Sequence, residues 1–263
     1  PHLHYELRDE FERPINPMAF KDYAVSDTIS PVVLGLYYKL IPENSVSGSN
    51  LSFNELKLKK ISDNLFISDT LKTSGPIGFG INSFDRMNNT WNKMGLSYIK
   101  TNIDGDEIFD MDLNSFSYDE WRHINTFIDY PSYKNKKIKI QKLYIEEFNP
   151  LDMYKRSLGD GVVKINERND TYLYSIKLFD FNKNVSEILV PIQWKKQNDL
   201  FTRKLDFDNM FKINTDSIYN FKFPGAKVSI EKNSFYTDKI IQIFEENNLL
   251  HVDKDSIPLL KGI

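Results

Sequence analysis

Apolar and polar residues alternate along much of the chain, and this period of two predicts β-strands. One strand is predicted over 32–40 and another over 137–145. Two more share the segment 171–192, with the turn between them at 182–184. Strands that follow one another closely, without helical patterns between them, indicate an antiparallel β-sandwich.

A hairpin and one helix complete the predicted elements. An Asp-Gly pair at 104–105 joins two alternating runs, and this pair is typical of a two-residue hairpin turn. The strands that it joins are expected to pair 98–100 with 107–109. By contrast, residues 118–129 carry apolar side chains at helical spacing, and Ser117 precedes them as a candidate N-cap.

Changes in the pattern divide the chain into three parts, and the predicted fold class is mainly β. Two prolines end regular structure early, so residues 1–24 are expected to be the end of a preceding lobe. Residues 25–195 are expected to form the antiparallel sandwich. After a polar stretch, residues 196–263 are predicted to form a second, incomplete β-domain.

Composition excludes several classes of function. The net charge of −3 offers no basic field for nucleic acid. Because the chain has no cysteine, it has neither a disulfide framework nor a thiolate metal site. The longest apolar stretch, SPVVLGLYYKLIP, is too short for a transmembrane helix and is interrupted by Gly35 and Lys39. The chain also begins at Pro1, within a strand-like motif, so we expect it to be part of a longer protein.

The first residues, PHLHYELRD, carry the most chemical information. His2, His4 and Glu6 alternate with apolar residues, which predicts a strand with all three polar side chains on one face. Two neighbouring imidazoles can share a metal, or one can bind metal while the other moves protons. The alternative is a surface strand with solvated histidines. It is weakened by the apolar flanks and by the scarcity of histidine, with 4 in the chain.

The motif PHLHYELRD resembles the final motif of lysostaphin-type peptidoglycan metallopeptidases, which has a His-x-His followed by an aromatic residue and Glu. Later segments are also similar to the regions that follow the peptidase lobe in an envelope-associated branch of that family. They are RPINPMAF, SDTISP, GFGINSFD, FDMDLNSFSYDEWRHINTFIDY and KLFDFNKNVS. The resemblance implies a remnant of a metallopeptidase β-lobe over 1–24 and an Ig-like β-sandwich over 25–195. In particular, DFNKNVS resembles the last hairpin of bacterial Ig-like modules.

The resemblance implies one zinc ion, with His4 as a ligand, His2 as the catalytic residue that assists proton transfer, and Glu6 supporting the polar face. The family's other two ligands come from an upstream His-x-x-x-Asp, which this chain lacks, so the zinc site is incomplete here. His251 and Asp255 have that spacing but in the wrong order, and we interpret them as coincidence. His123 is interpreted as a residue at the surface of the helix or the edge of the core.

Two functions follow as hypotheses. In the first, the chain is the downstream portion of a zinc metalloendopeptidase that cleaves peptidoglycan peptides in the periplasm or at the outer membrane. This chain alone is then expected to be inactive. In the second, the chain is a non-catalytic β-sandwich scaffold or binding subunit of an outer-membrane complex, with a degenerate peptidase lobe.

Three further sequence patterns have alternative interpretations. A cupin has His-x-His on a strand but needs a glutamate where this chain has Arg8 and Asp9. The acidic stretch NIDGDEIFDMDLN fails the spacing of a calcium-binding EF-hand loop and predicts a hairpin instead. The lysine-rich YKNKKIKIQK predicts an edge strand whose charges prevent pairing with other sheets.

Overall fold

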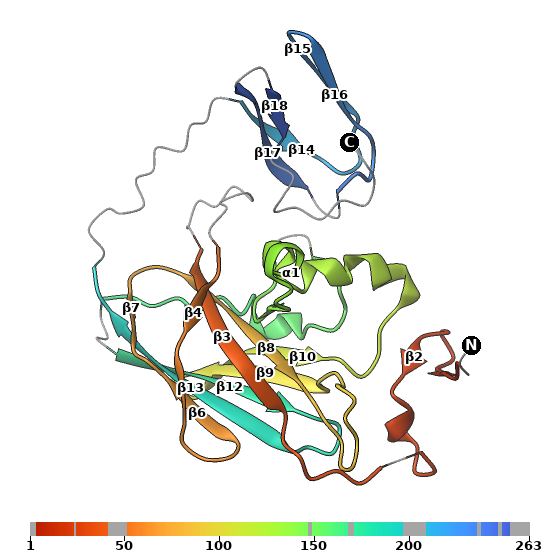
Figure 1. Cartoon of the computed structure of the whole chain (residues 1–263), viewed down its shortest axis with the longest axis vertical. Coiled ribbons are helices and arrows are strands. Elements are labelled where there is room, and N and C mark those ends of the chain that lie inside the picture. Colours follow the sequence, from red (N-terminus) through yellow and green to blue (C-terminus); the bar gives the residue numbers. More distant parts are fainter. Residues whose placement is uncertain are drawn as a thin grey trace.

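Strands dominate the computed structural model of the chain, which confirms the mainly β prediction (Figure 1). It describes residues 4–23, 25–41, 52–146, 149–167, 171–196, 209–235, 238–246 and 249–252. Two larger sheets lie in the first two thirds of the chain, and smaller sheets follow near its C-terminal end.

The first larger sheet has four strands in the order β11-β8-β3-β4. Their bounds are β3 (Val32–Leu40), β4 (Asn54–Leu56), β8 (Ile77–Phe84) and β11 (Gln141–Lys142). β3 covers the predicted strand over 32–40 and pairs with β8 in antiparallel fashion over most of its length. The predicted strand over 137–145 is reduced to β11, which does lie at the edge of the sheet.

The second larger sheet has seven strands in the order β10-β9-β12-β13-β6-β5, with β7 also pairing with β13. The predicted hairpins are present in it: β9 pairs with β10 around Asp104 and Gly105, and β12 pairs with β13. The predicted register of the first hairpin is wrong, because residues 98–100 pair with 110–112 and not with 107–109; a two-residue turn sets residue 103 beside 106, so positions farther from the turn pair farther along β10. The bounds are β5 (Leu58–Lys60), β6 (Leu65–Ser68), β7 (Leu71–Thr73), β9 (Tyr98–Ile103), β10 (Asp106–Asp112), β12 (Thr171–Phe179) and β13 (Val185–Trp194).

The prediction of purely antiparallel pairing is wrong for this sheet. β13 runs parallel to both β6 and β7, with Ile188 beside Phe66 and Ile192 beside Leu71. The reason lies in the pattern itself, because alternating side chains look the same in parallel and antiparallel strands. Pairing between segments more than a hundred residues apart is decided by tertiary contacts.

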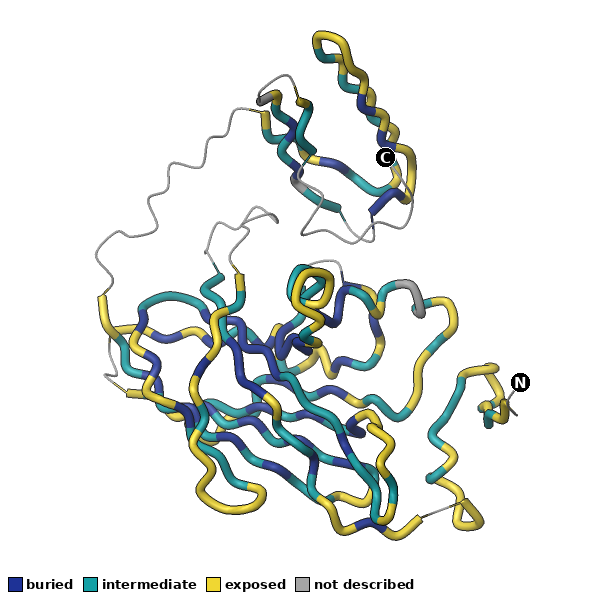
Figure 2. The backbone as a smooth tube through the Cα atoms, viewed as in Figure 1, coloured by how far each residue is buried: buried dark blue, intermediate teal, exposed yellow. Residues whose placement is uncertain are grey.

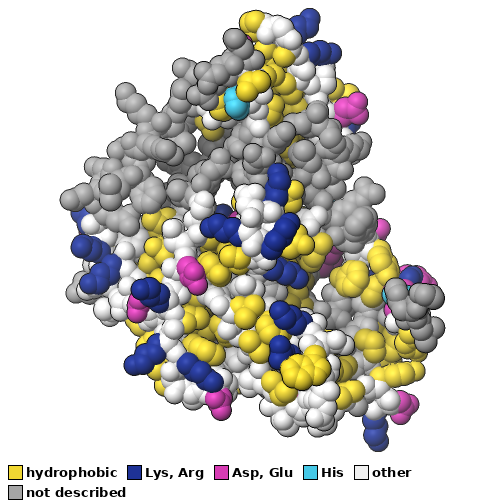
Figure 3. Space-filling view, viewed as in Figure 1, with side chains coloured by type: hydrophobic (Ala, Val, Ile, Leu, Met, Phe, Trp, Pro, Cys, Tyr) yellow, Lys and Arg dark blue, Asp and Glu magenta, His cyan; other side chains and the backbone are white. Residues whose placement is uncertain are grey.

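The two larger sheets share one apolar core (Figure 2). Leu36 and Phe79 enter it from the four-stranded sheet, and Tyr174, Ile176 and Ile188 enter it from the seven-stranded sheet. The rings of Phe79 and Tyr174 stack with their centroids 4.3 Å apart, which joins the sheets directly. Outside the core, apolar side chains remain at the surface between charged ones (Figure 3). The most exposed of the described large apolar side chains is that of Trp91, at 87%.

The predicted helix over 118–129 is wrong in type and length. Residues 118–126 form the 3-10 helix η2 (Tyr118–Thr126), and the α-helix α1 (Tyr130–Lys136) begins after it. The predicted cap is confirmed, because the Ser117 side chain accepts a hydrogen bond from the N–H of Asp119. Glu120, however, accepts a hydrogen bond from the N–H of Asp152 instead of closing a capping box. Contacts outside the segment therefore shape it.

The C-terminal strands have a core of their own. Ile213, Ile230 and Ile241 are buried there, apart from the core of the two larger sheets. The strands form a three-stranded sheet, β14-β17-β18, and the two-stranded β15-β16. The bounds are β14 (Met210–Ile213), β15 (Tyr219–Phe223), β16 (Ala226–Ile230), β17 (Lys239–Glu246) and β18 (Leu249–Val252). The predicted boundary at 195/196 stays a prediction.

The N-terminal segment contacts the part of the chain that follows β10. Strands β1 (Leu7–Arg8) and β2 (Pro14–Ile15) pair with each other, and the 3-10 helix η1 (Pro17–Ala19) follows. Ile15 forms an isolated β-bridge with Ser115, and the N–H of Asn16 donates to the carbonyl of Asn114. The start of the chain is therefore held by the segment that follows β10.

Replacement of Gly161 should destabilise the larger core. Its φ is +75°, and a Cβ there would lie 2.7 Å from the carbonyl oxygen of Leu143 and 2.6 Å from the ring of Phe109. Left-handed strain and the overlap together predict that Gly161→Ala lowers the free energy of unfolding by about 2–3 kcal/mol in chemical denaturation.

Gly225 offers the matched control, since its φ is +78° and a Cβ there meets nothing within 4 Å. Gly225→Ala should lose about 1 kcal/mol from strain alone. Equal losses in the two variants would contradict the overlap at Gly161.

Candidate functional site

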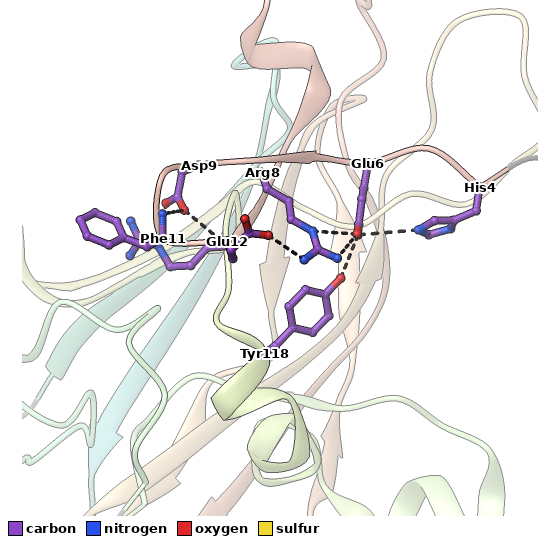
Figure 4. A network of polar contacts seen from close by, with 8 residues as sticks. His4, Glu6, Arg8, Asp9, Phe11, Glu12 and Tyr118 are labelled. Atoms are coloured by element: carbon purple, nitrogen blue, oxygen red, sulfur yellow. Dashed lines mark hydrogen bonds and ion pairs between the residues drawn. The ribbon is translucent and has the colours of Figure 1, made fainter.

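The described part of the histidine motif lies in an exposed polar network (Figure 4). His4 is 76% exposed, and its Nε2 lies 3.7 Å from Oε2 of Glu6. His2 lies outside the described residues. The predicted strand over the motif is absent from residues 4–6, and regular pairing begins at Leu7. The predicted strand is therefore wrong for residues 4–6, although His4 and Glu6 do lie on one side of the chain, as expected.

Glu6 is the centre of this network, and two side chains hold it in place. Arg8 donates to Oε1 from two of its nitrogens, with Nε at 2.9 Å, and Tyr118 donates its hydroxyl to Oε2 at 2.8 Å (Figure 4). These hydrogen bonds, that of Arg8 first, lower the pKa of Glu6. The Arg8 guanidinium also lies 5.0 Å from the centre of the Tyr118 ring. Glu6 thus connects the motif to η2, more than a hundred residues along the chain.

The residues around His4 do not form a zinc site by themselves. They supply one imidazole and one carboxylate that is already bound by an arginine and a tyrosine. Catalytic zinc needs about three protein ligands and a water. Within the described ranges, the single group of three candidate ligands does not include His4.

The remaining histidines lie elsewhere. His251, in β18, stacks on Phe244 with the ring centroids 5.0 Å apart, and Asp255 lies outside the described residues. His123, in η2, is partly buried, and burial lowers its pKa. Neither is brought near His4 by a contact within the described part of the chain.

Sequence reasoning missed a buried cluster of three aspartates. Asp27 precedes β3, Asp85 follows β8, and Asp180 follows β12, so the two larger sheets bring them together. One carboxylate oxygen from each lies within 4.8 Å of the others. Their exposed fractions are 7%, 4% and 2%. Three buried carboxylates at this separation form an unusually concentrated negative charge.

Hydrogen bonds fix two of the three carboxylates. Asp180 accepts from the N–H of Asn184 at 2.7 Å and from its side-chain amide at 2.6 Å. Oδ1 of Asp27 accepts from the N–H groups of Asn88 and Ile29, at 2.9 and 3.3 Å. The other oxygen of Asp27 and Oδ1 of Asp85 are buried and receive no hydrogen bond from an N–H or hydroxyl group of the described residues, while the carboxylate of Asp27 lies close enough to that of Asp180 to share a proton with it.

The electrostatics of the cluster are those of unneutralised carboxylates. Burial first, and then the neighbouring charges of Asp180 and Asp27, raise the pKa of Asp85 to about 7. Burial likewise raises the pKa of Asp180. The one contact that lowers the pKa of Asp85 is a backbone hydrogen bond at Arg86, and no lysine or arginine charge in the described chain does so.

The three aspartates lie in segments that carry the resemblance to the envelope-associated branch of the peptidase family. SDTISP contains Asp27, GFGINSFD contains Asp85, and KLFDFNKNVS contains Asp180. A carboxylate next to an apolar strand is a signal in each segment, but sequence alone does not show that the three meet. The acidic stretch around Asp104, weighed for calcium, forms the β9-β10 hairpin as expected.

Comparisons with family models, with curated proteins and with solved structures find no match to this chain. Among the described residues, no helix is both long and apolar enough to cross a membrane.

Proposed function

We propose that this chain is the downstream portion of a cell-envelope zinc metalloendopeptidase that acts on peptidoglycan peptides. The observation that carries the proposal is the HLHYE motif, whose glutamate is bound by Arg8 and by Tyr118 of the following β-rich part. Such an attachment suits the end of a peptidase lobe that must keep a defined orientation towards the next domain.

In this proposal the chain is inactive alone, and the rest of the zinc site comes from an upstream segment. His4 would be a ligand. Its imidazole is exposed, and its Nε2 lies 3.7 Å from Oε2 of Glu6. His2 would assist proton transfer. When bound, zinc would polarise the scissile carbonyl and lower the pKa of its water to about 7. Glu6, held by Arg8 and Tyr118, would orient the motif.

The finer fold assignments belong to the same proposal. Residues 1–24 would be the end of the peptidase lobe, 25–195 an Ig-like β-sandwich, and 196–263 a second, incomplete β-domain. Two separate apolar cores support a division of the β-rich part into two units. The periplasm or the outer-membrane surface would be the location, since the substrate is there.

The test is a zinc and activity measurement on the full-length protein that contains this chain. We expect about one zinc per molecule, and we expect His4→Ala to lose that zinc and at least about a hundred-fold of the hydrolysis of purified peptidoglycan. His251→Ala is the matched control, because that histidine stacks on Phe244 in a separate core, and it should retain both. A full-length protein that binds no zinc, or a His4→Ala variant with unchanged hydrolysis, would overturn the proposal.

A non-catalytic scaffold in an outer-membrane protein complex is the second candidate. It is favoured by one observation: the motif's only described histidine is 76% exposed and belongs to no group of three candidate metal ligands within the described chain. In this case a defined envelope complex should be recovered equally from wild type and from the double variant His2→Ala/His4→Ala. Loss of the complex in the double variant, together with loss of zinc, would favour the peptidase.

A further inference from the structure

We propose that Asp27, Asp85 and Asp180 form a binding site for one calcium ion at the end of the two larger sheets. The site is separate from the histidine motif and does not depend on the proposed peptidase function. It uses oxygen ligands from three segments that are far apart in the sequence and that the fold brings within 4.8 Å of one another.

The first argument is the state of the carboxylate oxygens. Oδ2 of Asp27 and Oδ1 of Asp85 are buried, and no N–H or hydroxyl donor among the described residues reaches them; the carboxylate of Asp27 lies instead against that of Asp180, although both Asp27 and Asp85 are more than nine-tenths buried. Buried polar atoms almost always have a partner, and a buried charge is paired or coordinates a metal. A cation placed between these oxygens would supply the missing partner for both.

The second argument is that the site is already shaped for a ligand. Asn184 holds both oxygens of Asp180, and backbone N–H groups hold one oxygen of Asp27. These donors orient the two carboxylates and leave an oxygen of Asp27 directed to the cluster. Outer contacts of this kind are what fixes the ligands of metal sites in general.

The donor chemistry selects the metal. Every side-chain donor of the cluster is a carboxylate oxygen, without a histidine. Hard oxygen donors suit Ca²⁺ and Mg²⁺, whereas zinc sites in proteins include histidine or cysteine among their ligands. Calcium accepts irregular geometry and several carboxylates, while magnesium keeps most of its waters and is bound by one or two. A dehydrated site with three carboxylates therefore favours calcium.

A bound ion would connect the N-terminal segment to the sheets. Asp27 lies in the stretch that leads from η1 into β3, and this stretch is also held by Asn182 and Asn184, which donate to the carbonyls of Val25 and Asp27 at 2.9 and 3.1 Å. Calcium would add a link from the same stretch to the ends of β8 and β12. Its binding would thus stiffen the connection that precedes the larger core.

The competing interpretation is that the carboxylates share protons instead of a metal. The two interpretations separate in the variant Asp85→Asn, which keeps the shape of the side chain and removes one charge. Without calcium, this variant should be at least as stable as wild type, because repulsion between buried carboxylates falls. It will therefore fold, and its response to calcium can be measured.

The experiment is thermal unfolding and calorimetric titration of this chain after removal of metals with EDTA. Calcium at about a hundred times its Kd should raise the Tm of wild type by about 5–10 °C, and titration should give one ion per chain. Asp85→Asn should lose the Tm rise and weaken binding at least about ten-fold. The exposed Asp106, at the start of β10, supplies the control Asp106→Asn, which should respond as wild type does.

Magnesium and zinc are the further arms. We expect magnesium to give a smaller rise in Tm than calcium at equal concentration. Any change in Tm that zinc causes should be the same in Asp85→Asn as in wild type. A wild-type Tm that does not change with calcium, or an equal calcium response in Asp85→Asn, would overturn the proposal in favour of shared protons. None of these readouts involves His4, so failure here leaves the peptidase proposal intact.

Discussion

Tyr174→Ala should lower the free energy of unfolding by about 4 kcal/mol, because it empties the centre of the larger core. The side chain is fully buried, and its ring stacks on Phe79 with the centroids 4.3 Å apart. Those two residues come from different sheets, so the cavity would lie where the sheets meet. Urea denaturation followed by circular dichroism measures the loss.

Tyr174→Phe is the matched control. The hydroxyl of Tyr174 and the Oγ1 of Thr101 are buried with no well-formed hydrogen bond among the described residues, although Thr101 is near enough to oppose the rise that burial causes in the pKa of Tyr174. Removal of an unsatisfied polar group leaves the packing intact and should change the free energy of unfolding by less than about 1 kcal/mol. A large loss in Tyr174→Phe would mean that the hydroxyl, and not the ring, stabilises the core.

Glu146→Gln should be the second strongly destabilising change, with an expected loss of about 3–4 kcal/mol. Oε1 of Glu146 lies 2.7 Å from Nζ of the buried Lys142, and Lys39 and Lys239 act on the same carboxylate. Removal of the carboxylate charge of Glu146 leaves the charge of Lys142 without the partner that lies 2.7 Å from it. Unfolding in urea at pH 7 measures the effect.

The stability that Glu146 contributes should depend on pH in a direction set by the shift of its pKa. Burial acts to raise the pKa of Glu146, but Lys142, Lys239 and Lys39 outweigh it and lower the pKa to about 2 from 4.5. A carboxylate whose pKa is depressed in the folded state contributes stability above its unfolded pKa and loses it as the pH falls towards the folded value. The difference between wild type and Glu146→Gln should therefore be full above about pH 4.5 and shrink between pH 4.5 and 2.

Lys39→Met tests whether charge or shape is responsible. Burial first, and then Lys142, lower the pKa of Lys39 to about 8, and its Nζ lies over the rings of Phe53 and Tyr144 at 5.3 and 5.5 Å. Loss of this disfavoured charge should cost about 1 kcal/mol or less at pH 7. A loss as large as that of Glu146→Gln would show that packing of the cluster matters more than its charge balance.

Local patterns were enough for the elements whose partners are close in sequence. The strand over 32–40 and the hairpins at 104–105 and 182–184 are found where the alternation and the turn residues predict them. Each needs only a period of two and a turn that tolerates positive φ, as at Asp104 and Lys183.

In the segment 118–145, local patterns did not predict the observed elements. Its helical spacing predicted one helix, and its alternation predicted one strand, yet the structure has η2, α1 and the short β11. Lys142, expected on a solvated edge strand, is buried against Glu146. A counter-charge offsets part of the cost of removing a lysine from water, and neither partner's position can be read from the local pattern.

By itself, the sequence determined the mainly β character, the hairpins, the Ser117 cap and the presence of a His-x-His motif with a glutamate beside it. Only the tertiary structure decided that β13 lies parallel to β6 and β7, that Tyr118 binds Glu6, and that three aspartates from distant segments share one buried space. The physical reason is the range of the interactions. Turns, caps and alternation depend on neighbours a few residues away, whereas sheet order and carboxylate clusters depend on contacts that exist only after the chain has folded.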